Sequence, residues 1–284
     1  MLISSTTNLF FSPYNDVSPS LSEAVARCSK AGFEALDLNL SRSSFFSGDW
    51  KRQLAEALKT AQKFGLSFLY AHVPYSYPAD NDEQGWQFFN RSVFQAIEAC
   101  AFAGVKYAAI HPHCFAVPNF DLQAAKAHSI EHLSPFIDKA DNLGVCLAIE
   151  NMRGPRAGEA MHRYCSTAEE LADLVDYFGG RAGACWDTGH ANIAGLDQGA
   201  ALKKLGSRLK MLHVNDNYGV DDEHIAPFTG TVDWSVVMSA LKDIKFEGSL
   251  NYEVGSRRMP HEIRPAFAQF LLQAGRELCK LGSA

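Results

Sequence analysis

The chain has 284 residues, a length that suits one large α/β domain or two smaller ones. Because 47% of the residues are hydrophobic and 20% are charged, the chain can bury a full core, which excludes a disordered protein. The formal net charge of -6, without a block of basic residues, gives no sign of nucleic-acid binding, although a local basic patch is not excluded.

Short apolar runs alternate with longer amphipathic stretches along the whole chain. The apolar runs are rich in aliphatic and aromatic residues, as in strands that are buried on both faces, and they lie at 2–5, 35–40, 67–72, 107–111, 145–150, 183–187, 210–214 and 249–253. Helical patterns follow them at 21–31, 51–64, 87–103, 122–143, 167–178, 200–205, 234–244 and 265–281. A strand followed by a helix is therefore predicted eight times.

Helix start and stop signals agree with these ranges. Ser166 or Thr167 stands before Glu169 and Glu170, which resembles a capping box. Glycines follow several helices shortly before the next strand, where a left-handed C-terminal residue is expected: Gly32, Gly65, Gly104 and Gly144.

The repeated pattern predicts a (β/α)₈ TIM barrel, because right-handed crossovers between parallel strands close in this way. No linker or shift of composition marks a second domain, so residues 1–284 are expected to form one domain. A doubly wound open sheet is the competing fold. It usually has fewer strands and a glycine-rich first turn, and residues 4–12 contain no glycine.

The cysteines and the N-terminal segment favour a cytoplasmic protein. The seven cysteines are odd in number and widely spaced, without a Cys-x-x-Cys pair, which indicates reduced thiols. The first ten residues, MLISSTTNLF, lack a basic segment and a long apolar segment, so no signal peptide is expected. No apolar run approaches about 18 residues, so no membrane span is expected either.

Six consecutive predicted strands end in histidine, aspartate or glutamate, and this repetition is the strongest signal in the sequence. Such a residue at the end of an apolar strand is unfavourable unless it is paired or binds a metal. Active sites of barrels lie at these strand ends and in the loops that follow. The residues expected to converge there are His72, His111, Glu150, Asp187, His190, His213, Asp222, His224 and Glu253.

Mixed imidazole and carboxylate side chains predict a divalent-metal site. Zn²⁺ is favoured and Mn²⁺ is the alternative, because an all-oxygen set would indicate Mg²⁺ or Ca²⁺. Four groups could hold one ion with open positions for substrate: Glu150, Asp187, His213 and Glu253. The remaining residues could complete one or two further sites, so one to three ions per chain are expected. A single histidine of this kind is usually only a satisfied polar residue, and it is their joint occurrence that indicates metal binding.

Other polar and aromatic residues allow two interpretations each. His128 and His132 are spaced like a metal-binding pair on a helix, but we expect them on a solvated outer face, and His113 in a loop or in support of the site. Arginines of the predicted mouth loops either bind phosphate or are solvated charges: Arg153, Arg156, Arg163, Arg257 and Arg258. Aromatic residues there could wall a sugar pocket, stack on a base or only pack: Tyr75, Tyr77, Phe115, Trp186, Tyr218 and Phe228.

Taken together, the motifs HVPY, IHP, IEN, CWDTGHANIAG, HVND, DEH followed by GTVDW, and NYEVG resemble the xylose isomerase-like barrel superfamily, from the third strand to the eighth. This superfamily includes isomerases and epimerases of sugars and sugar phosphates, and the abasic-site nuclease endonuclease IV. The ketose 3-epimerase branch implies one Mn²⁺-type ion on Glu150, Asp187, His213 and Glu253. It further implies that the two glutamates form an acid and base pair and that His190 contacts substrate.

The endonuclease IV branch implies three zinc ions on all nine residues. Three stretches depart from the patterns of these branches, the first being His111-Pro112-His113, where endonuclease IV has His-Pro-Gly. Phe228-Thr229-Gly230 stands where endonuclease IV has Gly-Glu-Gly, and Asn215-Asp216-Asn217-Tyr218 lacks the arginine that the ketose epimerases place there. The ligand set therefore leans towards the nuclease, and the surrounding motifs towards the sugar isomerases.

The first functional expectation is a divalent-metal-dependent isomerase or epimerase of a sugar, sugar phosphate or related polyhydroxy carbonyl compound. Glu150 and Glu253 would transfer the proton through a metal-stabilised enediolate. Tyr75, Trp186 and Arg257 are expected to bind this small carbohydrate. The expected partners include no membrane, and a homo-oligomer is left open.

The alternative is a zinc-dependent abasic-site endonuclease that binds DNA, with Tyr75 entering the duplex at the lesion. The acidic balance and the few basic residues in the mouth loops argue against it. The third hypothesis is a metal-dependent dehydratase or a binding protein.

Overall fold

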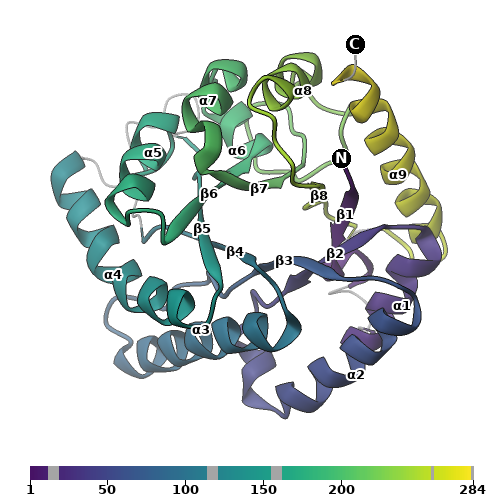
Figure 1. Ribbon diagram of the computed structural model, residues 1–284, viewed down its shortest axis with the longest axis horizontal. Helices are drawn as coiled ribbons and strands as arrows, with labels where there is room; N and C mark the ends of the chain where they lie inside the picture. Colours follow the sequence, from purple (N-terminus) through teal and green to yellow (C-terminus); the bar gives the residue numbers. More distant parts are fainter. Residues whose placement is uncertain (12–18, 114–120, 155–161, 257–258, 283–284) are drawn as a thin grey trace.

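In the computed structural model, which describes residues 1–11, 19–113, 121–154, 162–256 and 259–282, the strands form a ring that the helices surround (Figure 1). Eight parallel strands follow one another in the order β7-β6-β5-β4-β3-β2-β1-β8. A parallel bridge between Val214 and Tyr252 joins the two outermost strands. The fold is therefore a single-domain (β/α)₈ barrel, as predicted, and the open sheet is excluded. The strands are β1 Ile3–Thr6, β2 Ala35–Asn39, β3 Phe68–His72, β4 Tyr107–Ile110, β5 Cys146–Glu150, β6 Ala182–Asp187, β7 Leu209–His213 and β8 Leu250–Tyr252.

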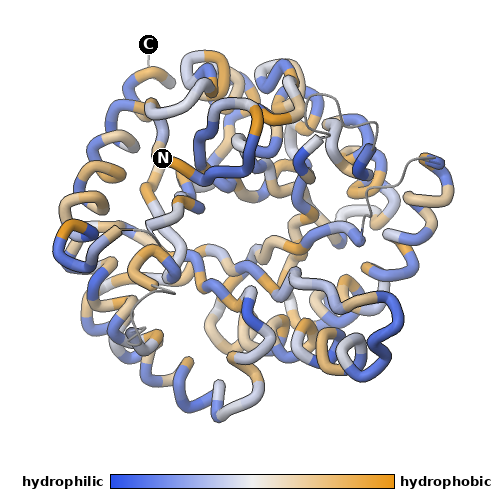
Figure 2. Tube along the Cα trace, turned by 180° about the vertical axis from the view of Figure 1, so that it is seen from behind, coloured by the Kyte–Doolittle hydropathy of each residue, from blue (hydrophilic) through white to orange (hydrophobic). Residues whose placement is uncertain are grey.

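The helices pack around the barrel, and the tube along their chain alternates between hydrophobic and hydrophilic stretches, as amphipathic helices require (Figure 2). The short helix that follows β6 was not predicted, whereas the other α-helices lie within a few residues of the predicted ranges. The α-helices are α1 Leu21–Ala31, α2 Trp50–Lys63, α3 Glu83–Ala103, α4 Leu122–Asn142, α5 Ala168–Tyr177, α6 Thr188–Ile193, α7 Gln198–Leu205, α8 Trp234–Asp243 and α9 Arg264–Leu281. Short 3₁₀ helices are η1 Thr7–Phe10, η2 Ser43–Ser47 and η3 Gly206–Arg208.

Local capping explains where several of these helices begin and end. The Ser20 side chain accepts a hydrogen bond from the backbone N–H of Glu23, whose carboxylate accepts one from the backbone of Ser20. Thr167 caps α5 by accepting from the N–H of Glu170, which confirms the predicted start. Gly32 ends α1 with a φ of 99°, a left-handed conformation that costs glycine little.

The interior of the barrel sets the direction of the functional side chains. Five residues of adjacent strands pack together inside the barrel: Tyr70, Ala109, Ala148, Cys185 and Met211. Because strand side chains alternate between the two faces, the residue two positions later points inward one layer closer to the C-terminal end. Those residues are His72, His111, Glu150, Asp187 and His213.

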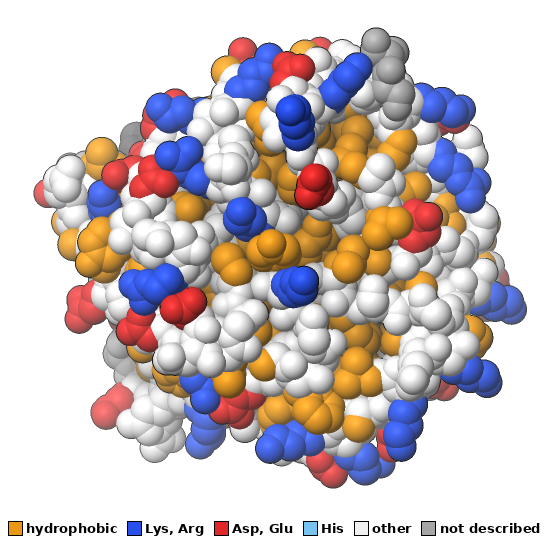
Figure 3. Space-filling view, in the orientation of Figure 1, with side chains coloured by type: hydrophobic (Ala, Val, Ile, Leu, Met, Phe, Trp, Pro, Cys, Tyr) orange, Lys and Arg blue, Asp and Glu red, His pale blue; other side chains and the backbone are white. Residues whose placement is uncertain are grey.

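The space-filling view shows one face of the molecule. Hydrophobic side chains gather towards the middle of this face, and Lys, Arg, Asp and Glu lie scattered among and around them (Figure 3). Within the part of the chain that the structure describes, no helix is long and apolar enough to cross a membrane.

Candidate metal centre

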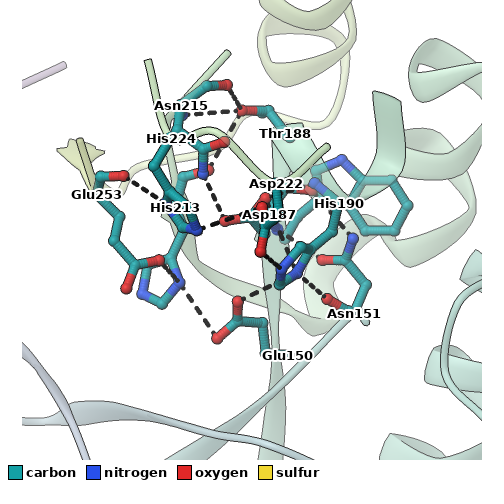
Figure 4. A network of polar contacts seen from close by, with 12 residues as sticks. Glu150, Asn151, Asp187, Thr188, His190, His213, Asn215, Asp222, His224 and Glu253 are labelled. Carbon is teal, nitrogen blue, oxygen red and sulfur yellow. Dashed lines mark hydrogen bonds and ion pairs between the residues drawn. The ribbon is translucent and has the colours of Figure 1, made fainter. Parts of the chain in front are cut away.

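Glu150, the last residue of β5, lies at the centre of the inward-facing layer. Its Oε2 atom is 3.4 Å from His72 Nε2, 3.3 Å from His111 Nε2 and 3.2 Å from His213 Nδ1. Glu253, which follows β8, approaches the same His213 Nδ1 atom to 3.0 Å with its own Oε2. Figure 4 shows the two glutamates on either side of the His213 ring. Two carboxylates thus share one imidazole nitrogen.

Asp187 ends β6 and is held from three directions. Its Oδ1 accepts from the backbone N–H of His190 at 2.7 Å, which makes it the N-cap of α6. Its Oδ2 accepts from Asn215 Nδ2 at 2.6 Å, and Asn151 Oδ1 accepts from its backbone N–H at 2.6 Å. Asn151 directly follows β5, and Asn215 lies close to the end of β7. The two strands on either side of β6 therefore fix the orientation of this carboxylate.

A second group lies nearer to solvent, on α6 and on the segment after β7. Asp222 Oδ2 is 3.3 Å from His190 Nε2, and Asp222 Oδ1 is 3.3 Å from His224 Nε2. His190 joins this outer group to the inner one, because its Nδ1 lies 3.5 Å from Glu150 Oε1 (Figure 4). His224 has a positive φ of 47°, an uncommon conformation for a residue with a side chain.

The histidine orientations fit metal binding. The Nδ1 atoms of His72, His190 and His224 each lie 2.8 Å from a backbone carbonyl, of Val73, Asn151 and Glu253 in that order. A carbonyl only accepts, so Nδ1 carries the hydrogen and a neutral ring turns its Nε2 lone pair towards a carboxylate. Histidines that bind metals are oriented by such second hydrogen bonds. Lone pairs that face one another require a cation or a proton between them, which is the environment that a divalent ion fits.

The electrostatics of the centre lead to the same requirement. Burial raises the pKa of Glu150, but the adjacent His213 and His111 rings outweigh this effect and hold that pKa well below its usual range. Burial lowers the pKa of His190, but Asp187 and Asp222 raise it well above the ordinary value. The group is therefore a set of anions that needs positive charge at its centre. Protons and a metal ion compete for that place.

Eight of the predicted ligands form three groups, two of which share residues, and within each group the ligand atoms lie within 4.8 Å of one another. They are His72, Glu150 and His213; Glu150, Asp187, His213 and Glu253; and His190, Asp222 and His224. The ninth predicted ligand, His111, contacts Glu150 but belongs to none of these groups. All nine residues lie at the mouth of the barrel, and Glu150 and His213 each belong to two of the groups.

The three predicted substrate-binding residues have different positions. Tyr75 lies at the mouth, where its ring stacks on His111 at a centroid distance of 4.8 Å and an interplanar angle of 25°. Trp186 is fully buried on the outer face of β6, and its Nε1 donates to Gln198 Oε1, so it does not reach the mouth. Because strand residues alternate, the inward direction of Asp187 sends Trp186 outward, and the expectation that Trp186 binds substrate is wrong. Arg257 lies outside the described residues.

The structure also corrects the reading of His128 and His132 as a purely solvated surface. His128 is exposed, but its Nε2 contacts Nδ1 of the buried His113, and His132 packs against the same ring at a centroid distance of 4.5 Å. Aromatic rings complete this cluster: Tyr77, Trp86 and Phe89. Tyr77 also donates to the backbone oxygen of His111 at 3.2 Å, so the cluster supports a residue of the site.

Asp37 of β2 was missed by the sequence reasoning. It is buried inside the barrel, where its Oδ2 accepts from Asn251 Nδ2 at 2.7 Å and lies 4.0 Å from His213 Nε2. Only one signal in the sequence marked it, a charged residue in the middle of an apolar strand. Asn151 and Asn215 stood in the recognised motifs, but the sequence did not indicate that they orient Asp187.

Comparison with known proteins places this geometry in a family. D-Psicose 3-epimerase of Enterocloster bolteae is 28% identical over 136 residues, which are 46% of this chain and 40% of the epimerase. Inosose isomerase of Bacillus velezensis is 24% identical over 182 residues, 62% of each protein. The chain thus matches less than two thirds of the length of either relative. These two relatives are an epimerase and an isomerase.

A solved structure extends the likeness of fold to the whole chain, and a family profile matches most of it. The crystal structure of the IOLI protein with a bound zinc atom has a TM-score of 0.74 and 20% sequence identity, and the match covers 100% of this chain and 98% of that one. This likeness shows a common fold. The profile of the xylose isomerase-like TIM barrel family matches residues 25–273. The chain belongs to the xylose isomerase-like TIM barrel family.

Proposed function

We propose that this protein is a divalent-metal-dependent isomerase or epimerase of a sugar, a sugar phosphate or a related polyhydroxy carbonyl compound. The observation that carries the proposal is the pair of carboxylates, Glu150 and Glu253, beside one imidazole nitrogen at the mouth of the barrel. The isomerase and epimerase relatives support the same reaction class. The four-residue group with Asp187 and His213 would hold the ion, with zinc favoured over manganese.

Proton transfer is the task of the two glutamates. One carboxylate removes the proton from the carbon next to the carbonyl, and the other, in its protonated form, returns a proton to the opposite face. Glu253 is 22% exposed whereas Glu150 is buried, so substrate that enters the mouth meets Glu253 first. When bound, a divalent ion supplies polarisation of the carbonyl, which acidifies the neighbouring C–H bond.

Two further residues are proposed to position the substrate. His190 joins the inner and outer groups and presents its Nε2 to the mouth beside Asp222. Tyr75, stacked on His111, forms a wall of the same opening. A substrate ring that is held between an aromatic wall and charged groups keeps one orientation. This orientation determines which C–H bond of the substrate is broken.

The endonuclease alternative draws on the outer group of His190, Asp222 and His224, which would complete a multinuclear zinc site. The two curated relatives, an epimerase and an isomerase, do not favour this alternative. The same protein preparation can test both activities.

The decisive experiment follows solvent deuterium into substrate. Protein stripped of metal and reloaded with Zn²⁺ or Mn²⁺ is incubated in D₂O with a panel of ketoses, ketose phosphates and inososes, and NMR follows exchange at the carbon next to the carbonyl. We expect exchange with at least one compound, lost on chelation and in Glu253→Gln. The control is Glu247→Gln, an exposed glutamate before β8, which should exchange as the wild type does. Nicking of an abasic-site oligonucleotide, without exchange into any sugar, would contradict the proposal.

A further inference from the structure

A cavity of about 500 Å³ lies beside the metal centre, between the segment after β2 and the segment after β3. Both segments leave the C-terminal ends of their strands, so the cavity opens at the same end of the barrel as the metal centre. Its size falls in the range of small-molecule binding sites, which is about 300–1,000 Å³. The residues that line it include Ser41, Arg42, Ser44, Tyr75, Asp82 and Phe88.

Arg42 and Asp82 are the charged residues of the lining, and within the described part of the chain neither forms an ion pair. Among the described residues, no carboxylate lies within ion-pair distance of Arg42, whose guanidinium packs over the Phe11 ring at 5.6 Å. Asp82 caps α3 by accepting from the N–H of Gly85 and makes no ion pair within the described chain. A ligand in the cavity therefore meets a positively charged donor, Arg42, and a negatively charged acceptor, Asp82. Hydroxyl groups of a neutral ring satisfy both, because a hydroxyl donates and accepts.

Serine hydroxyls and aromatic rings complete a surface that suits a sugar. Ser41, Ser43, Ser44 and Ser76 belong to the lining. The Ser41 hydroxyl donates to Asn39 Oδ1, so it can only accept from a ligand, whereas the other hydroxyls can donate and accept. Phe88 and Tyr75 present apolar ring surface to the C–H groups of a pyranose. A phosphate would fit less well, because the Asp82 carboxylate repels it.

Tyr75 connects the cavity with the metal centre. It lines the cavity, and its ring stacks on His111 and lies 5.0 Å, between centroids, from His72. A ligand that spans Tyr75 therefore places one part at the carboxylates and another part in the cavity. A free monosaccharide bound at the metal centre would not fill this cavity, which would then contain water.

We propose that the cavity is a subsite for a second, uncharged sugar ring, so that the preferred substrate is a glycosylated keto sugar. The proposal rests on the isomerase or epimerase function proposed above and names its substrate class. The cavity and the metal centre would bind the two rings of one molecule, and the energy of binding the distant ring would orient the reacting one.

The kinetic experiment compares D-fructose with the glucosyl-fructoses maltulose, leucrose and isomaltulose, which keep the same carbonyl group and the same C3–H bond. We expect at least one of the three to exceed D-fructose about tenfold in kcat/KM. Arg42→Ala and Ser44→Trp should reduce this advantage to about twofold or less, the first by removing a donor and the second by filling the cavity. Arg276→Ala, an exposed arginine of α9, is the matched control and should keep it.

A binding experiment separates failure of the subsite from failure of the proposed function. Methyl α-D-glucopyranoside carries no carbonyl group and cannot react, and its contact with the chelated protein is followed by saturation-transfer NMR. We expect binding in the wild type and in Arg276→Ala, and loss in Ser44→Trp. Such binding without turnover of any sugar would support the subsite and reject the isomerase function.

Two results would overturn the subsite. The first is turnover of D-fructose with no advantage for any glucosyl-fructose and no binding of the methyl glucoside. The second is a preference for D-fructose 6-phosphate that Arg42→Ala abolishes, because the cavity would then be an anion site.

Discussion

Glu150 is the residue on which the centre depends most directly, because it belongs to two of the three ligand groups. Because its carboxylate is buried, water cannot compensate for the loss of its charge. The four-residue group and the histidine-rich group therefore share one anion, and a change at this position acts on both.

The first prediction concerns the charge of this residue. Glu150→Gln should weaken metal binding and reduce activity at least about a hundredfold, because the bound metal would lose a buried carboxylate that belongs to two of the ligand groups. The barrel core is untouched, so the far-UV circular dichroism should match that of the wild type. Metal content by mass spectrometry and kcat test the prediction, with Glu247→Gln as control. Wild-type metal content and activity would show that Glu150 is not a shared ligand.

The second prediction concerns the outer group. In Asp222→Asn combined with His224→Ala, only His190 of its three residues remains, which is too few to keep an ion there. We expect the number of bound ions per chain to fall by one while the inner group keeps its ion. If the protein binds a single ion, the double variant should instead raise KM and leave the stoichiometry at one. A zinc-soaked crystal of the wild type without density near His190 would exclude the outer site.

At the scale of elements, α6 decides where His190 lies. This short helix begins at Thr188, with Asp187 as its N-cap, so a strand end, a proposed metal ligand and a helix start coincide at one residue. Gly189 in its first turn lies against Asn215 and Asn217, which leave no space for a side chain. The helix is therefore locked onto the segment after β7.

The third prediction tests this contact. A Cβ atom at position 189 would lie 1.9 Å from Asn215 Oδ1, so Gly189→Ala must displace Asn215 from Asp187. We expect a loss of about 1–3 kcal/mol in the free energy of unfolding and weaker metal binding. Gly48→Ala is the control, because its Cβ would meet only Gln53 Nε2 at 3.8 Å. Denaturant titration and metal titration measure both effects, and equal values for the two variants would refute the close contact.

At the scale of the whole molecule, stability at acid pH depends on histidine side chains that are neutral in the folded protein. Burial, together with the neighbouring His113 and His128, lowers the pKa of His132 from 6.5 to about 3. Above pH 6.5 the folded and unfolded chains both hold this ring neutral. Between pH 6.5 and about 3 the unfolded chain binds the proton and the folded chain does not, so stability falls as the pH falls.

The fourth prediction concerns a variant that should lack this loss of stability on protonation. His132→Phe should lose less stability than the wild type between pH 7.5 and pH 5, by about 1–2 kcal/mol. Phenylalanine cannot be protonated and keeps the contacts with Trp86 and Phe89. Chemical denaturation at both pH values gives the difference, and the two proteins are compared so that other titrating groups cancel. Parallel pH profiles would show that His132 does not stay neutral in the folded state.

The sequence by itself determined the barrel and brought most residues of the candidate metal centre to one mouth. Short apolar runs and amphipathic helices are local patterns, and eight repeats of them leave few topologies. The strand ends could be placed in one mouth without coordinates, because parallel strands end on the same side of a barrel. Glu150, Asp187 and His213 were therefore found from their positions alone.

Only the tertiary structure decided which neighbours those residues have. Trp186 and Asp187 are adjacent in sequence but point to opposite faces, and the register of β6 settles which one faces the mouth. His132 lies on an outer helix by its pattern, yet the loop after β4 folds His113 against it. Asp37 lies below His213 only because the barrel closes. Such contacts join residues far apart in the chain, and no local propensity encodes them.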